Sequence, residues 1–404
     1  MNGAVEPVAI RSGIVVALLT GLASPVLADC PAANRYSFLF ASRPVTNLSY
    51  TGGPYSYTAT NPAGQSIILH VNFAAYGLTT NVNASGVPLP QIGTAVNNGG
   101  STNWLDVGGL FPSRTADITS NTRVIVTTFA FPMVVRDVQV TVADIDAANT
   151  DGWRDWIMFT GKNGAANYVP VLTTPYGQQN GGMLTGPTST VRLGPTSTPL
   201  TVGVSEAVGI FINANTNPNG NVTVSVGQPV TTLEMRFGNY PLQSGESVTN
   251  ANMFGINGVS FCPMPNLSVS KTSTAWSDPV SGTVNPKNIP GGDVIYTMTV
   301  SNADTSPVDL STLALTDVLP ANLTFYNGDI DDGGPLTTNF EFTPGTSGLT
   351  FGAANFTYSN NGGATYGYAP SAGYDAAVNA LKFTPTGSMP ANSAFTIKFR
   401  ARIK

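Results

Sequence analysis

Short runs of alternating apolar and polar residues dominate this chain. Residues 294–301 read Val-Ile-Tyr-Thr-Met-Thr-Val-Ser, and residues 138–142 and 222–226 alternate in the same way. A period of two sends every second side chain to one face, as in a strand with one buried face. Gly, Pro, Asn and Ser separate the runs, and no window of the mature chain has a convincing amphipathic helical pattern. The pattern predicts an all-β protein.

The first two thirds of the chain carry many such runs, at residues 36–40, 67–73, 124–129, 138–142, 207–212, 222–226 and 233–237. Short strands with turn residues between them and no intervening helices are typical of a β-sandwich or jelly roll. Pro263 and Pro265 then punctuate the chain. We therefore expect a large, jelly-roll-like N-terminal β-sandwich over residues 29–264 and a second domain over residues 265–404.

The second domain has its own series of motifs. Leu267, Val269 and Lys271 alternate with Ser, and turns and strands follow in order: Lys271-Thr272, Pro290-Gly291-Gly292-Asp293, Tyr296 to Val300, Asn302 to Pro307 and Asp317-Val318-Leu319-Pro320. Over residues 266–404 this order resembles the bacterial conserved-repeat domain, an immunoglobulin-like β-sandwich family of unknown function. The resemblance implies an extracellular or envelope protein with a spacer or display role.

The N-terminus predicts export. Arg11 precedes a short apolar run at residues 13–22, and Val26-Leu27-Ala28 has the small-residue pattern of a cleavage site. We interpret residues 1–28 as a Sec-type signal peptide. The run is shorter than the ~20 apolar residues that a transmembrane helix needs. We expect a secreted or cell-envelope protein with no transmembrane segment in the mature chain.

Two cysteines bracket the first predicted domain. Cys30 lies just after the expected cleavage site, and Cys262 lies just before the second domain. Exported chains commonly oxidise such a pair to a disulfide, whereas a metal or redox site favours closer spacing and histidine partners. We predict a Cys30–Cys262 disulfide.

Composition narrows the class of partner. Charged residues make up 10% of the chain, and the formal net charge is −5. Nucleic-acid binding needs clustered Lys and Arg, so we expect no nucleic-acid partner. Solvation must depend largely on hydroxyl and amide side chains, as in many extracellular β-proteins.

One loop concentrates acidic residues. Asp144, Asp146, Asp151 and Asp155 follow an apolar strand, and this Asp-Ile-Asp segment gives residues 36–262 a distant similarity to lectin-like adhesin β-sandwich modules. Hard cations prefer such oxygen ligands, so the loop is a candidate calcium site, although its spacing is not that of an EF-hand. The alternative is that these aspartates cap turns by accepting backbone N–H bonds.

Trp153 and Trp156 flank the same loop. Exposed aromatic rings can stack on sugars, which makes them candidates for binding an extracellular glycan; the alternative is that they close the end of a hydrophobic core. Trp104 is expected in another Gly/Asn-rich loop.

Signatures of catalysis are missing from the sequence. His70 is the single histidine, and it lies mid-strand without marked partners for a Ser-His-Asp triad. We expect an exported structural or adhesive surface protein with no catalytic role, whose partner is a glycan or a surface protein. The alternative is a secreted carbohydrate-binding or carbohydrate-active protein.

Overall fold

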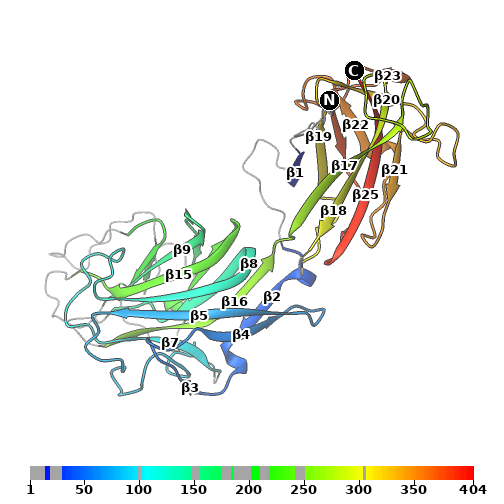
Figure 1. Cartoon of the computed structure of the whole chain (residues 1–404). Coiled ribbons are helices and arrows are strands. Elements are labelled where there is room, and N and C mark those ends of the chain that lie inside the picture. The colour runs from blue at the N-terminus through cyan, green and yellow to red at the C-terminus, as the bar shows by residue number, and fades with distance from the viewer. Residues whose placement is uncertain are drawn as a thin grey trace, which may run out of the picture. The chain divides into compact units, whose positions relative to one another are not determined.

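The chain forms two compact units that are built from strands (Figure 1). The computed structural model describes residues 14–18, 30–98, 100, 102–147, 154–174, 183–185, 202–209, 216, 218–241, 251–303 and 306–404. Over these residues the helical elements are short 3₁₀ turns, and no α-helix occurs. The all-β prediction is therefore confirmed. No helix in the described part of the chain is long and apolar enough to cross a membrane.

The first unit, Leu27–Met264, contains a fifteen-stranded antiparallel sheet. Its strands are β2 (Tyr36–Leu39), β3 (Thr46–Asn47), β4 (Tyr55–Thr60), β5 (Ser66–Tyr76), β6 (Gln91–Gly93), β7 (Trp104–Gly109), β8 (Val124–Ala143), β9 (Asp155–Asn163), β10 (Ala166–Tyr168), β11 (Val171–Thr173), β12 (Met183–Thr185), β13 (Glu206–Gly209), β14 (Val222–Val226), β15 (Val230–Asn239) and β16 (Asn252–Pro263).

Strand β8 is the longest of these, with 20 residues, and it has different neighbours along its length. Its first half pairs with β5 and β15, and its second half pairs with β14 and β16. Because β16 also pairs with β2, β2 with β4 and β4 with β5, the strands β8, β5, β4, β2 and β16 close into a ring. These five strands contribute many of the buried side chains of the core.

The core of the first unit is rich in aromatic side chains. Fully buried phenylalanines come from strands across the sheet, at Phe129, Phe159, Phe237, Phe254 and Phe261. Phe237 and Phe254 contact each other with ring centroids 4.7 Å apart. Each large aromatic ring buries a large apolar surface, and together these rings supply much of the hydrophobic stabilisation of this strand-built unit.

The predicted disulfide is present. Cys30 and Cys262 are joined, with Cα atoms 5.9 Å apart and 232 residues apart in sequence. Both side chains are buried. The bridge ties the chain just before the short turn η1 (Ala32–Asn34) to the end of β16, so it closes nearly the whole first unit into one loop.

The second unit contains Pro265–Lys404 and strand β1 (Ile14–Leu18). Strand β1 lies within residues 1–28, the expected signal peptide, so we expect the mature chain to lack this strand. Its further strands are β17 (Leu267–Ser277), β18 (Asp293–Asn302), β19 (Leu313–Val318), β20 (Leu323–Asn327), β21 (Phe340–Thr343), β22 (Phe356–Ser359), β23 (Gly373–Asp375), β24 (Ala380–Phe383) and β25 (Ser393–Ile403). Strands β17, β18, β25, β20, β23 and β21 form one sheet, and β1, β19, β24 and β22 form another. Side chains from both sheets share one hydrophobic core.

Most expected strands are found, with some differences. The two expected strands at 124–129 and 138–142 are one continuous strand, β8, and residues 210–212 lie outside the described residues. The loop expected around Trp104 is wrong, because Trp104 begins β7 and is buried. Strands β7 and β16 contain glycines that break the alternating pattern, so the pattern did not reveal them.

Removing the disulfide should destabilise the first unit. The double variant Cys30→Ala/Cys262→Ala gains chain entropy when unfolded, so we expect a loss of up to about 5 kcal/mol in the free energy of unfolding. Denaturant unfolding under non-reducing conditions measures this loss. Reductant should lower the stability of the unmodified protein and leave the double variant unchanged; equal stability of the two proteins without reductant would contradict the expectation.

Candidate functional site

A tight loop follows the end of β8 and contains two buried aspartates. Asp144 has φ +66°. This left-handed conformation is one that Asp tolerates better than most residues, because its short polar side chain can bond locally. Asp144 and Asp146 are only 7% and 4% exposed, although they lie in a loop. Burial of two neighbouring carboxyl groups requires specific support from the surrounding strands.

Two glycines allow the backbone of this loop to approach its neighbours. A Cβ atom at Gly209, at the end of β13, would lie 1.8 Å from the carbonyl oxygen of Asp146. At Gly220 a Cβ atom would lie 3.2 Å from Cα of Asp144. The amide of Ile145 donates to the carbonyl of Gly220 at 3.1 Å. The loop is thus held between two segments that are distant in sequence.

Asp155, the first residue of β9, is hydrogen-bonded to the same loop. Its Oδ2 accepts the backbone N–H of Asp146 at 3.1 Å, and its own N–H donates to the carbonyl of Asp146 at 2.9 Å. Its Oδ1 accepts from Nδ2 of Asn252 at 2.9 Å. Asp155 therefore connects the loop to the start of β16, which is the role expected of a capping carboxylate.

A fourth carboxyl group, Asp106, reaches this region through strand pairing. Asp106 of β7 lies opposite Gly255 of β16, and Gly255 lies opposite Ala143 of β8, just before Asp144. The four residues Asp106, Asp144, Asp146 and Asp155 are called the aspartate cluster below. The sequence prediction did not include Asp106, although an acidic residue within the run Trp-Leu-Asp-Val was a signal that could have identified it.

The pKa values of three members of this cluster, Asp106, Asp144 and Asp155, are raised. Burial raises the pKa of Asp106 to about 7, against hydrogen bonds from the backbone of Val96 and Ala95 and from Gln91, which lower it. Burial, and then repulsion by Asp146 and Asp106, raises the pKa of Asp144 well above its ordinary value. The pKa of Asp155 is raised by burial and by repulsion from Asp146 and Asp144. The cluster therefore takes up protons more readily than exposed aspartates do.

Unpartnered oxygens lie in and beside the cluster. Oδ1 of Asp144 is buried without a hydrogen-bond partner. The side-chain oxygens of Asn252 and Asn221 are also buried without partners. Asn252 donates to Asp155 through its Nδ2, and Asn221 follows Gly220 in the chain. Buried acceptors without donors are costly, so they favour a proton, a water or a cation. In the part of the chain that the structure describes, however, no group of three or more acidic, histidine or cysteine side chains is arranged to hold a metal ion.

The predicted calcium ligands are therefore brought together in part. Asp144, Asp146 and Asp155 act on one another electrostatically, whereas Asp151 lies outside the described residues, as does Trp153. Calcium binding stays a prediction.

Trp156 has its own environment. Its indole N–H donates to Glu206 at 2.9 Å, and its ring packs edge-on against Tyr240 with centroids 5.0 Å apart. The side chain is only 8% exposed and belongs to a small hydrophobic cluster with Val208 and Val124. In this arrangement the ring contributes to a core and offers little surface for stacking on a sugar.

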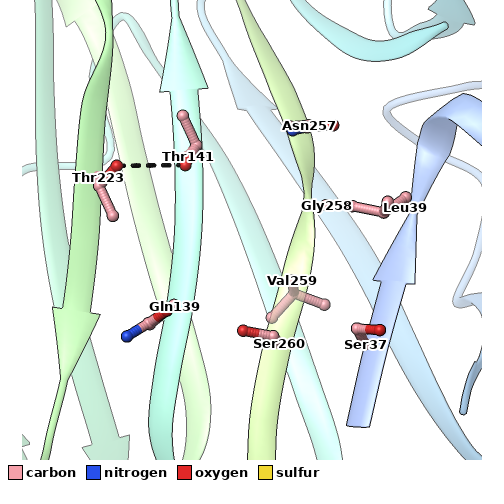
Figure 2. A pocket seen from close by; sticks show the side chains of 9 residues that line it. All are labelled: Ser37, Leu39, Gln139, Thr141, Thr223, Asn257, Gly258, Val259 and Ser260. Atoms are coloured by element: carbon pink, nitrogen blue, oxygen red, sulfur yellow. Dashed lines mark hydrogen bonds between the residues drawn. The ribbon is translucent and has the colours of Figure 1, made fainter. Parts of the chain in front are cut away.

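A pocket of about 150 Å³ lies across four adjacent strands of the same unit. Figure 2 shows β14, β8, β16 and β2 side by side, with the hydroxyls of Thr141 and Thr223 hydrogen-bonded at 3.2 Å. Most of the lining side chains are uncharged and polar, among them Ser37, Gln139 and Ser260. These groups both donate and accept hydrogen bonds, as hydroxylated ligands require.

A second pocket, of about 290 Å³, has aromatic and cationic walls and is called the tyrosine pocket below. Tyr55, Tyr57, Arg43 and Asn47 contribute to its lining, and the Arg43 guanidinium lies 5.8 Å from the ring centroid of Tyr57. Tyr57 is only 8% exposed, so the partly exposed ring of Tyr55 is the aromatic surface of this pocket. An aromatic ring beside amide and guanidinium donors suits recognition of a polar ring-shaped ligand.

The single histidine lies beside this pocket. Nδ1 of His70 is 3.1 Å from the hydroxyl of Ser56, its cross-strand neighbour, and Ser56 also lines the tyrosine pocket. Among the described residues no hydrogen bond joins His70 to a carboxylate. The arrangement is thus a Ser–His pair without the orienting acid of a triad.

No protein-family model matches the chain, and no curated protein matches it.

The aspartate cluster should make stability depend on pH. A buried carboxyl with a raised pKa binds its proton more tightly in the folded chain than in the unfolded chain. Its contribution to the free energy of unfolding is therefore fully present below its pKa in the unfolded chain. This contribution is lost as the pH rises through its pKa in the folded chain. For Asp106 this window runs from about 3.8 to about 7. We expect the free energy of unfolding, measured by denaturant titration in chelator, to fall across this window.

The variant Asp144→Asn tests the origin of this fall. It removes one repelling charge, so the decline should become shallower than in the unmodified protein. Asp117→Asn is the matched control, because Asp117 is exposed and its pKa is lowered by hydrogen bonds from Thr119. A decline of equal steepness in Asp144→Asn, or no decline in the unmodified protein, would contradict the cluster as its cause.

Calcium addition tests the sequence prediction for the same cluster. A bound cation would replace protons at neutral pH, so calcium should raise the melting temperature progressively with free ion concentration. The shift should disappear in Asp144→Asn and persist in Asp117→Asn. Thermal melts in calcium and in chelator measure it, and a flat titration of the unmodified protein would refute calcium binding.

Proposed function

We propose that this chain is an exported bacterial cell-surface or extracellular protein with a structural or adhesive role and no catalytic role. The observation that carries the proposal is the Cys30–Cys262 disulfide. Disulfides of this kind form and persist in oxidising compartments and are rare in the cytosol. The expected signal peptide at residues 1–28 agrees with such a location.

The finer architecture belongs to the same proposal. We infer a jelly-roll-like sandwich for residues 29–264 and an immunoglobulin-like module of the conserved-repeat type for residues 265–404. Support comes from the two sheets around one core in the second unit and from the motif order between Lys271 and Pro320. Antiparallel strands with one buried face tolerate extended polar surfaces, which suits a module that spaces or displays a binding unit.

The binding surface is assigned to the first unit. The two pockets described above have hydroxyl, amide and aromatic side chains in their lining. The low content of charged residues in the chain disfavours a strongly charged partner. The partner that fits this chemistry is an extracellular glycan or a polar protein surface.

The second candidate is a carbohydrate-active protein, and the tyrosine pocket is the observation that favours it. The Ser56–His70 pair beside the pocket provides a hydroxyl and an imidazole in contact. Catalysis by this pair would need an orienting acid and an oxyanion site as well.

Turnover distinguishes the two candidates. We expect the purified protein to bind polysaccharide on a glycan array and to release no reducing ends from the glycans that it binds. Asn47 is an exposed residue that lines the tyrosine pocket. The variant Asn47→Ala should bind the polysaccharide about tenfold more weakly, because it loses one hydrogen bond to the ligand. Asn322→Ala in the second unit is the control and should leave binding unchanged. Release of reducing ends would contradict the structural or adhesive role.

A further inference from the structure

Two charged residues of the second unit lie at strand positions whose side chains point into the hydrophobic core. In β17 the inward positions are Leu267, Val269 and then Lys271, and in β19 Asp317 follows Leu313 and Leu315 on the buried face. The Lys271 side chain is 7% exposed and the Asp317 side chain is 0% exposed. Lys and Asp are almost never buried this deeply unless they are paired.

The two side chains meet between the sheets. Nζ of Lys271 lies 2.6 Å from Oδ2 of Asp317. The same nitrogen lies 4.5 Å from the ring centroid of Tyr296 and 5.5 Å from that of Phe399. Both rings are buried, and they stack with centroids 5.3 Å apart. Aromatic walls therefore shield the amine and the carboxyl from solvent.

The other carboxyl oxygen of Asp317 is left without a partner. Its Oδ1 is buried and accepts no hydrogen bond, so the carboxylate is satisfied on one side only. A charge-paired carboxylate in a core is usually stabilised by additional donors, since one ion pair seldom repays the cost of desolvating two charges. The Lys271–Asp317 ion pair therefore carries a large desolvation cost. A neutral product formed from the two side chains would remove most of this cost.

We propose that Lys271 and Asp317 condense to an intramolecular isopeptide bond. Nζ of Lys271, as the neutral amine, attacks Cγ of the protonated Asp317 carboxyl. A bond forms between Nζ and Cγ, the bond from Cγ to one carboxyl oxygen breaks, and that oxygen leaves as water with its own hydrogen and one hydrogen from the amine. The sum is ammonium plus carboxylate to amide plus water, so no oxidant, activated ester or other co-reactant is needed.

Two physical effects favour the reaction at this position. Burial raises the pKa of Asp317, although the neighbouring Lys271 acts to lower it, and the raised pKa favours the protonated carboxyl that the reaction needs. Positioning is the second effect, because well-oriented intramolecular groups react with effective concentrations of roughly 10⁵ M or more. The unpartnered Oδ1 is available to take up the proton that the amine releases as the new bond forms.

The bond would change the mechanics of the second unit. Strand β17 lies at one end of its sheet and pairs with β18, whereas β19 belongs to the other sheet. A bond between residues 271 and 317 would tie the two sheets covalently and prevent β17 from separating. A module that transmits load outside the cell gains from such a link, since an amide does not dissociate as a salt bridge does.

Mass measurement tests the proposal on the full chain purified from the cells that produce it. With the disulfide reduced, the intact protein should weigh one water molecule less than its sequence requires. Trypsin should fail to cleave after Lys271 and should yield a branched peptide that joins residues 237–287 to residues 288–382. The Lys271→Arg variant should have the full mass, because guanidinium does not form this amide.

Lys398→Arg is the matched control. Lys398 and Glu341 form an ion pair at 3.0 Å in the same unit, but each side chain is 33% exposed. This variant should still lack one water, with the loss mapped to Lys271. Full mass and linear peptides in the unmodified protein would overturn the proposal, and so would a water loss that persists in Lys271→Arg. Because the result for the unmodified protein is decisive by itself, the test does not depend on whether Lys271→Arg folds.

Discussion

The first unit depends on the pairing of one long strand, β8. Its 20 residues have antiparallel neighbours on both sides, so the main-chain groups of much of the unit are satisfied through it. Since side chains alternate along a strand, a slip of one residue would send the whole buried face of β8 to solvent. The same pairing fixes where β8 ends, and the buried loop with Asp144 begins there.

Burial within the strand-built units also determines which charged side chains need compensation. A polar residue at an inward position loses its hydration and needs a partner or a proton. The first unit meets this requirement at the aspartate cluster with hydrogen bonds and raised pKa values, as at Asp106 and Asp155. The second unit meets it at Lys271 and Asp317 with opposite charges enclosed by aromatic rings. Lys271 and Asp317 lie within otherwise apolar strand faces, whereas Asp144 and Asp146 lie in a buried loop.

The sequence was sufficient for features that depend on local pattern. Alternation predicted an all-β chain, and the two cysteines of an expected exported chain predicted the disulfide. Long-range pairing was not predictable in this way. Asp106 joins Asp144 only because β16 lies between β7 and β8, and nothing near Asp106 in the sequence specifies that order. Trp156 illustrates a further limit, because its burial depends on Tyr240 and Glu206 from distant segments.

Export into an oxidising compartment is the central claim of this account, and peptide mapping of the native protein tests it most directly. Protein should be recovered from the cell exterior or envelope and digested without reductant. We expect residues 1–28 to be absent and the peptides with Cys30 and Cys262 to be joined by a disulfide. Recovery only from the cytosol, with residues 1–28 intact and both thiols free, would contradict it.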